Sequence, residues 1–215
     1  MVRQSKEALT RTAKREGSAQ GYSKGQAKRE EILIGVMGAL SRNELRNPSL
    51  KAIGRNLGIE PAHILYYFGS REELMQAVIR RWDEDSTSPA ESGRSDAGLS
   101  LDAFADVVEA NLSRPGVVHL YLTLAAEAVD PGHPAHDFVQ ARFDRVKASL
   151  AASIRREQAE GRIGGDHDPE IEARLLIALA DGLQLQSLVD PHVDAVRHIR
   201  AAIAGLRGSA GLSAG

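Results

Sequence analysis

The stretch that decides the fold is residues 49–79, which read SLKAIGRNLGIEPAHILYYFGSREELMQAVI. Ser49 is a typical helix N-cap residue, and apolar residues then recur on one helical face: Leu50, Ile53 and Leu57. Gly58 supplies a tight turn, and Pro61 suits the first turn of a second helix because its missing N–H loses no hydrogen bond there. Two short helices joined by a glycine turn are typical of a helix-turn-helix.

Helical patterns flank this stretch on both sides. Upstream, apolar residues with a spacing of four predict a helix from Gln26 to about Ser41: Ile32, Val36 and Leu40. Downstream, Ser70 followed by Glu73 is a capping box, which predicts a longer fourth helix to about Trp82. We therefore expect three short helices followed by a connecting helix, with Trp82 packed between two parts of the protein.

The rest of the chain also predicts helices. After a Ser, Gly and Pro-rich loop over 83–100, apolar stripes resume and continue on a long helix to about Glu160. Asp168 and Pro169 begin a further helix, which is apolar on more than one face up to Val189, and one last helix follows. No strand pattern, repeat or heptad run is present. The predicted fold is all-α, with a three-helix, homeodomain-like unit, a larger helical domain and about nine helices in total.

Composition sets the expected domain organisation. The sequence predicts a disordered basic tail (1–25), a helix-turn-helix domain with its connecting helix (26–82), a larger helical domain (83–207) and a flexible tail (208–215). Cysteine is absent from the 215 residues, and we see neither a signal peptide nor an apolar run of membrane-spanning length. We therefore expect a cytoplasmic protein that does not enter a membrane.

Charge is distributed unevenly along the chain. Residues 1–82 carry 15 Lys and Arg against 8 Asp and Glu, whereas residues 83–215 carry 12 against 21. A basic surface favours a polyanion because neutralised phosphates release counterions, and an acidic surface is repelled from the same partner. The charges alone are equally consistent with a solvated surface, but together with the motif they point to DNA binding by the N-terminal part.

The residues quoted above resemble the N-terminal domain of the TetR family of transcriptional regulators, strongly over about residues 27–82. Two later segments, LTLAAEAVDPGHPAHDF and EGRIGGDHDPEIEARLLIALADGLQLQSLVDP, look like the ligand-binding domain of some actinobacterial members. The resemblance implies a homodimeric repressor that a small molecule releases from a palindromic double-stranded DNA operator.

Family positions imply which residues contact DNA. The expected set comprises the cap of the second helix, the exposed turn of the recognition helix and the start of the fourth helix: Ser49, Lys51, Glu60, Pro61, Ala62, His63, Tyr66, Tyr67 and Arg71. Arg71 is expected to bind a phosphate at a helix N-terminus, and one of the two tyrosines is expected to pack in the core instead. The sequence departs from the family at Leu65, where a phosphate-contacting tyrosine is usual, and at Glu60.

Helical phase predicts two further sets in the C-terminal part. A ligand pocket is expected to be lined by Phe104, Val108, Asn111, His119, Tyr121, Leu122, Phe143 and Leu176. A dimer interface is expected on the last two helices at Leu175, Leu179, Leu183, Leu188, Ile199 and Ile203.

Two alternative classes stay open at this point. The first is a helical-bundle enzyme or metal protein, for which His133, His136 and Asp137 are the nearest approach to a metal site. We find no convergent catalytic set, so we expect no catalytic residue, no metal and no cofactor. The second is a DNA-binding adaptor whose C-terminal domain binds only protein.

Overall fold

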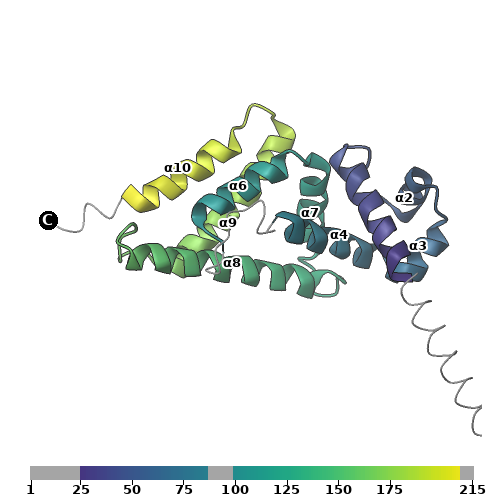
Figure 1. Cartoon of the computed structure of the whole chain (residues 1–215), viewed down its shortest axis with the longest axis horizontal. Helices are drawn as coiled ribbons and strands as arrows, with labels where there is room; N and C mark the ends of the chain where they lie inside the picture. Colours follow the sequence, from purple (N-terminus) through teal and green to yellow (C-terminus); the bar gives the residue numbers. More distant parts are fainter. Residues whose placement is uncertain (1–24, 87–98, 209–215) are drawn as a thin grey trace, which may run out of the picture.

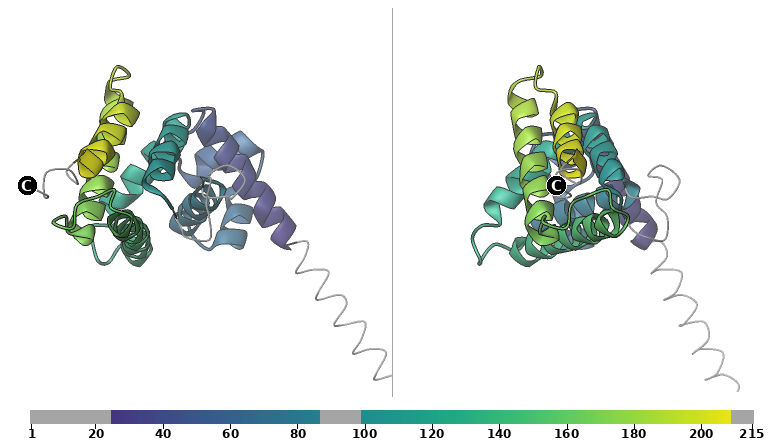
Figure 2. Two further views of the ribbon diagram at one scale, coloured as in Figure 1. Left: turned by 60° about the vertical axis from the view of Figure 1, so that its left-hand side comes forward. Right: turned by 90° about the vertical axis from the view of Figure 1, so that its left-hand side faces the viewer.

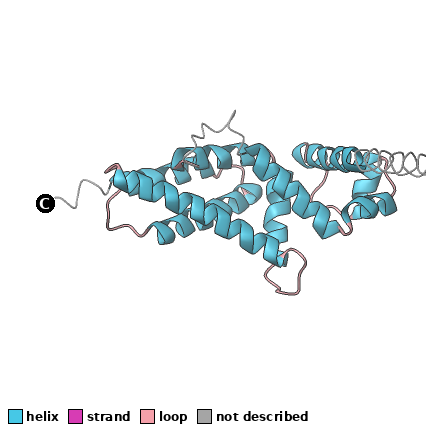
Figure 3. Ribbon diagram, turned by 60° about the horizontal axis from the view of Figure 1, so that its bottom comes forward, coloured by secondary structure: helices cyan, strands magenta, loops and turns pink. Residues whose placement is uncertain are grey.

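A computed structural model describes residues 25–86 and 99–208, and these residues form helices joined by turns (Figure 1; Figure 3). The elements are a first helix over 25–41, α2 (Leu50–Leu57), α3 (Pro61–Phe68), α4 (Arg71–Ser86), α6 (Leu101–Leu112), α7 (Pro115–Glu127), α8 (His136–Ala159), α9 (Pro169–Val189) and α10 (Ala195–Gly208). The described ranges contain no strand, so the prediction of an all-helical fold is confirmed. The two predicted tails fall largely on residues 1–24 and 209–215, which lie outside these ranges, as do residues 87–98 of the predicted loop.

Short-range signals fix the helix-turn-helix as predicted. The Ser49 Oγ accepts a hydrogen bond from the backbone N–H of Ala52 at 3.2 Å, which caps α2. Gly58 ends that helix with φ at 66°, a left-handed conformation that glycine adopts without strain. Pro61 stands in the first turn of α3, and the Ser70 Oγ accepts from the Glu73 N–H at 3.0 Å at the start of α4.

Helix α4 continues to Ser86, four residues beyond its predicted end. Its last turn is supported by an i,i+4 ion pair between Arg81 and Asp85 at 2.8 Å. Asp83 in the same turn is held by ion pairs to α8. Side-chain contacts therefore stabilise a helical turn over residues that the sequence predicts as a loop.

The buried side chains form two hydrophobic clusters. The first combines the first helix, α2, α3 and α4 with α7 and the start of α8, and it includes Trp82. The second combines α6, the later part of α8, α9 and α10. The first helix and α10 lie at opposite ends of the molecule (Figure 2). Trp82 packs near the Tyr121 ring of α7, with ring centroids 6.4 Å apart, as expected for a residue between two parts of the chain.

Within the described ranges, no helix combines the length and the apolar character that crossing a bilayer requires.

Candidate nucleic-acid interface and cavity

Most of the residues expected to contact DNA are exposed on the helix-turn-helix. Ser49 and Lys51 at the start of α2 are exposed, as are Glu60, Ala62 and His63 around the start of α3. Ile64 and Phe68 face the opposite way and are buried in the first cluster. Helix α3 therefore presents one turn of small and polar side chains to solvent while its other face holds it to the protein.

The two tyrosines of α3 differ in environment, as the sequence predicted. Tyr66 is 82% exposed, whereas Tyr67 is half-buried against the first cluster. Their rings meet edge to face with centroids 5.1 Å apart, and both line a shallow hollow beside Gln26 and Arg29 of the first helix. This arrangement leaves the Tyr66 hydroxyl available to an external partner.

Arg71 makes contacts inside the chain that the sequence did not reveal. Its Nε donates to the Pro48 carbonyl at 2.9 Å and its Nη1 donates to Glu72 at 3.2 Å, while Nη2 contacts the Asn47 side chain. Arg71 thus ties the start of α4 to the loop before α2. The Arg71 guanidinium already holds the start of α4 against the loop before α2. A DNA phosphate would have to bind the same guanidinium alongside these contacts.

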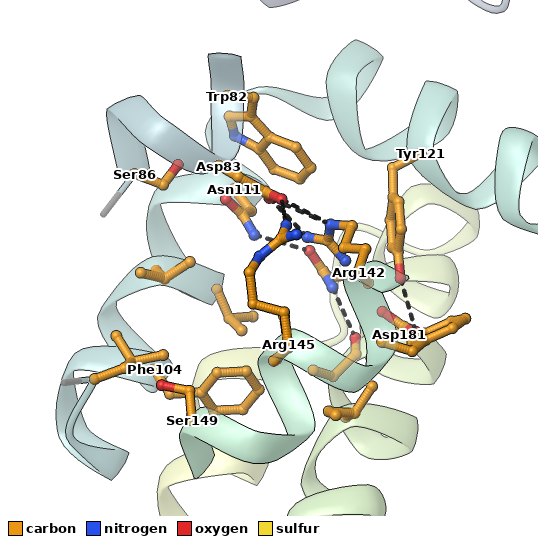
Figure 4. A pocket seen from close by; sticks show the side chains of 18 of the residues that line it. Trp82, Asp83, Ser86, Phe104, Asn111, Tyr121, Arg142, Arg145, Ser149 and Asp181 are labelled. Carbon is orange, nitrogen blue, oxygen red and sulfur yellow. Dashed lines mark hydrogen bonds and ion pairs between the residues drawn. The ribbon is translucent and has the colours of Figure 1, made fainter. Parts of the chain in front are cut away.

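A cavity of about 410 Å³ lies between the end of α4 and helices α6, α7, α8 and α9 (Figure 4). Five residues expected in a ligand pocket line it: Phe104, Val108, Asn111, Tyr121 and Phe143. Its volume is in the range of small-molecule sites.

Three residues expected in the pocket do not line this cavity. Leu122 packs against the first cluster and Leu176 is buried in the second, where the next residue, Ile177, faces the cavity instead. His119 is half-buried outside the cavity lining, and its Nδ1 is buried without a hydrogen-bond partner. The predicted residues are one or two positions away from residues that do line the cavity. Successive side chains on a helix point about 100° apart, so an error of one position selects a different face.

The polar wall of the cavity was not predicted from the sequence. Asp83 receives a bidentate ion pair from Arg142, with Nε–Oδ2 at 3.0 Å and Nη2–Oδ1 at 2.9 Å, and a further bond from Arg145 Nη2 at 2.9 Å. The Arg142 guanidinium also lies 4.3 Å above the Tyr121 ring. The available signal was Arg142 itself, a charge on the apolar stripe that runs from Val139 to Val146, since a charge on a core-facing stripe requires a partner.

Tyr121 connects this wall to α9. Its hydroxyl donates to Asp181 Oδ2 at 3.2 Å. Burial raises the pKa of the Asp181 carboxyl, although the Arg142 charge and the hydrogen bond from Tyr121 act in the opposite direction. Burial likewise raises the pKa of the Tyr121 hydroxyl, which therefore stays protonated and serves as a donor.

Helix α9 carries an exposed apolar stripe on the face away from the cavity. Its large members are Ile171, Leu175, Leu185 and Val189, and Ala178 and Gly182 fall between them. The spacing alternates between four and three residues, so all six positions share one face of the helix. Apolar residues that are exposed together on one face in this way are typical of an interaction surface.

The predicted interface residues are corrected by this geometry. Ile199 and Ile203 are buried within the chain, as is Leu183, and Leu179 and Leu188 are half-buried against the two clusters. Of the predicted set, only Leu175 belongs to the exposed stripe. The reason is that the apolar face of α10 packs on α6 and α9 of the same chain, so it has no surface left for a partner.

The C-terminal half of the chain matches a known protein family. Residues 101–208, half of the sequence, match the family model described as the BetI-type transcriptional repressor, C-terminal. No curated protein sequence matches the chain.

Solved structures share the fold. A TetR-family transcriptional regulator from a Rhodococcus species, itself described as putative, is 24% identical with a TM-score of 0.63, and the match covers 84% of this chain and 99% of that one. SmeT, described as the repressor of a Stenotrophomonas maltophilia multidrug efflux pump, is 20% identical with a TM-score of 0.58, covering 86% and 91%. A SmeT–triclosan complex is 18% identical with a TM-score of 0.55, covering 85% and 91%. With the family model over its C-terminal half and a helix-turn-helix at its other end, the chain belongs to the TetR family of transcriptional regulators.

Proposed function

We propose that this protein is a homodimeric repressor, without enzymatic activity, that binds a near-palindromic operator and leaves it when a small molecule occupies the cavity. In this proposal residues 26–82 contact DNA, and residues 83–207 bind the effector and form the dimer. The finer resemblance to actinobacterial members stays a prediction. The complex of SmeT with triclosan supports a small-molecule effector for a protein of this fold.

The observation that carries the proposal is the position of α4. This helix begins three residues after α3 ends, and Trp82, Asp83 and Ser86 in its last turns form part of the cavity wall. A molecule that fills the cavity must contact the helix that supports the recognition helix. Ligand and operator are then coupled, and each lowers the affinity of the other by the same factor.

Dimerisation follows from the apolar stripe on α9. Ala201, Ala204 and Gly205 expose only small side chains on α10, which lies beside α9. Two copies can therefore pack these helices closely as a four-helix arrangement about a two-fold axis. Such a dimer places two copies of α3 to read two half-sites in successive major grooves.

The first test is the salt dependence of operator affinity. A duplex selected from a random library should bind more weakly as salt rises from 50 to 200 mM, by roughly 10³-fold if about six phosphates are contacted. Fluorescence anisotropy on the labelled duplex measures the slope. An affinity that does not change over this range would contradict contact between the basic N-terminal part and the phosphates.

A second test separates phosphate contacts from base contacts. Arg71→Ala should weaken binding to all duplexes by a similar factor, because its guanidinium holds α2 and α4 in register beside the phosphates. His63→Ala should instead relax the preference at particular base pairs, because His63 lies in the exposed turn of α3. Arg155→Ala, on the distant helix α8, is the control and should change neither. Altered base preference in Arg71→Ala with unchanged nonspecific affinity would refute the assignment.

A further inference from the structure

The polar end of the cavity offers more hydrogen-bond donors than acceptors. Two guanidinium groups, from Arg142 and Arg145, share the single carboxylate of Asp83 (Figure 4). Arg145 uses one of its donor atoms in this contact, and its side chain is more than half exposed. A guanidinium carries five N–H donors in a planar fork that matches a carboxylate. The site therefore has the charge and the geometry to hold a second oxyanion.

Two buried polar atoms beside these arginines lack a partner. The Trp82 side chain is 2% exposed and its Nε1 donates to no acceptor. Asn111 is 6% exposed, and its Nδ2 donates to Gln184 Oε1 at 3.4 Å while its Oδ1 accepts nothing. Because Gln184 Nε2 donates to the Ala180 carbonyl, its Oε1 must face Asn111, which fixes this orientation. Unpartnered buried groups are costly unless a ligand satisfies them. The indole N–H of Trp82 is a further donor for a ligand oxyanion, whereas the Asn111 Oδ1 is an acceptor and is not satisfied by a carboxylate.

A cationic ligand does not fit the same wall. The face of Tyr121 is covered by the Arg142 guanidinium at 4.3 Å, so the position where an aromatic ring would attract a ligand cation is already filled. Two further carboxyls line the cavity: that of Asp181 accepts the hydrogen bond of Tyr121, and that of Glu84 belongs to an exposed residue of α4. An added cation would face two arginines at close range.

The opposite end of the cavity is apolar. The apolar residues that line the cavity include Phe104 and Val107 of α6, Phe143 and Val146 of α8 and Ile177 of α9. Figure 4 shows Phe104 at the far side of the cavity from the Asp83 cluster. The cavity thus pairs a cationic, donor-rich end with a hydrophobic end.

We propose that the effector is an organic carboxylate with an apolar body, and that its carboxylate competes with Asp83 for Arg142 and Arg145. This inference rests on the proposed function, since it names the ligand class of the same cavity. Asp83 is the intramolecular occupant of the oxyanion site, and it belongs to α4, whereas both arginines belong to α8. When the effector carboxylate replaces Asp83, the ion pairs that join α4 to α8 break. The helix behind the recognition helix is then free to move.

The test compares three probes with one carbon skeleton: 4-phenylbutyrate, 4-phenylbutanamide and 4-phenylbutan-1-amine. Binding to the full-length protein is followed by the fluorescence of Trp82, the only tryptophan, and by calorimetry. The acid should bind at least about tenfold more tightly than the amide, the difference expected for charge-assisted hydrogen bonds, and the amine should bind most weakly. An amide or amine that binds as tightly as the acid overturns the proposal, and so does the failure of all three probes to bind at millimolar concentration.

Matched variants test the residues. Arg145→Gln should remove the preference for acid over amide, while Arg155→Gln, an equally exposed arginine on the same helix, should keep it. Asp83→Asn should strengthen binding of the acid several-fold and weaken operator binding without any probe, because it removes the competing charge and the bridge together. Asp106→Asn, which removes the same charge from an exposed ion pair on α6, should do neither. Acid binding that is insensitive to both Arg145→Gln and Asp83→Asn overturns the assignment of the oxyanion site.

Operator binding distinguishes the two proposals. If the amide or the amine binds and releases the operator while the acid does not, the ligand class is wrong and the repressor function stands. If the acid binds as predicted but the operator affinity is unchanged, the oxyanion site stands and the effector-driven release of DNA fails.

Discussion

Leu175→Glu combined with Leu185→Glu should convert the proposed dimer into a folded monomer. Both side chains are more than half exposed in the isolated chain, so their replacement leaves the intrachain core intact. In a two-fold dimer along the α9 stripe, however, each substitution occurs twice, and four unpaired carboxylates would be buried in an apolar interface. Each buried unpaired charge costs several kcal/mol. The dissociation constant of the dimer should therefore rise by at least ~10³-fold, which corresponds to ~4 kcal/mol.

Sedimentation velocity at micromolar concentration measures this change, and circular dichroism checks that the helices persist. Ile34→Glu is the matched control, because Ile34 is 56% exposed, as Leu175 is, but lies on the first helix away from the stripe. The control should stay dimeric. The double variant should also lose most of its affinity for a full operator, since a monomer contacts only one half-site. A double variant that sediments as a dimer would remove α9 from the interface.

The helix-turn-helix could be predicted from sequence because its signals are local. Ser49, Gly58, Pro61 and Ser70 each act on backbone atoms within about four residues, through a cap, a left-handed turn or a fixed φ. These caps and turns form without contacts to distant parts of the sequence. Hence the start and end of α2 and α3 follow directly from the order of residues.

The proposed interface on α9 is harder to predict from sequence because the helix is apolar on more than one face. Leu175 and Leu179 are equally hydrophobic, yet one is exposed and the other half-buried against the second cluster. Which face becomes the core depends on α6, α7, α8 and α10, which all pack on α9 in the folded chain. Periodicity predicts that a stripe exists, but the partners decide which stripe stays outside.

The polar wall of the cavity depends on tertiary structure for the same reason. Asp83 lies 59 residues before Arg142 in the sequence, and nothing local to either residue predicts their ion pair. The extension of α4 to Ser86 brings Asp83 to α8, and this extension itself depends on the contacts that it makes. Cavity residues such as Phe104 and Val108 can be predicted from helical periodicity alone. The ion-pair cluster around Asp83 cannot, because it depends on which helices pack together.

Gly116→Ala should destabilise the whole protein, because Gly116 lies where α7 meets the first helix. A Cβ atom built at Gly116 would stand 2.3 Å from the Leu40 carbonyl oxygen and 3.1 Å from that of Leu45. Both obstacles are backbone atoms, so relief requires α7 to move away from the end of the first helix. The neighbours of Gly116, Val117 and Val118, are buried in the cluster that also contains Trp82, and the shift would open this cluster.

Overpacking against backbone should lower the free energy of unfolding by ~1–3 kcal/mol and the midpoint temperature by ~2–12 °C. Urea denaturation followed by circular dichroism measures the first quantity. Gly38→Ala is the matched control, since its Cβ would approach only the tip of the Arg42 side chain, which can turn aside. There, alanine should stabilise the helix by ~0.5–1 kcal/mol. Equal stabilities for Gly116→Ala and the parent protein would show that α7 does not rest closely on the end of the first helix.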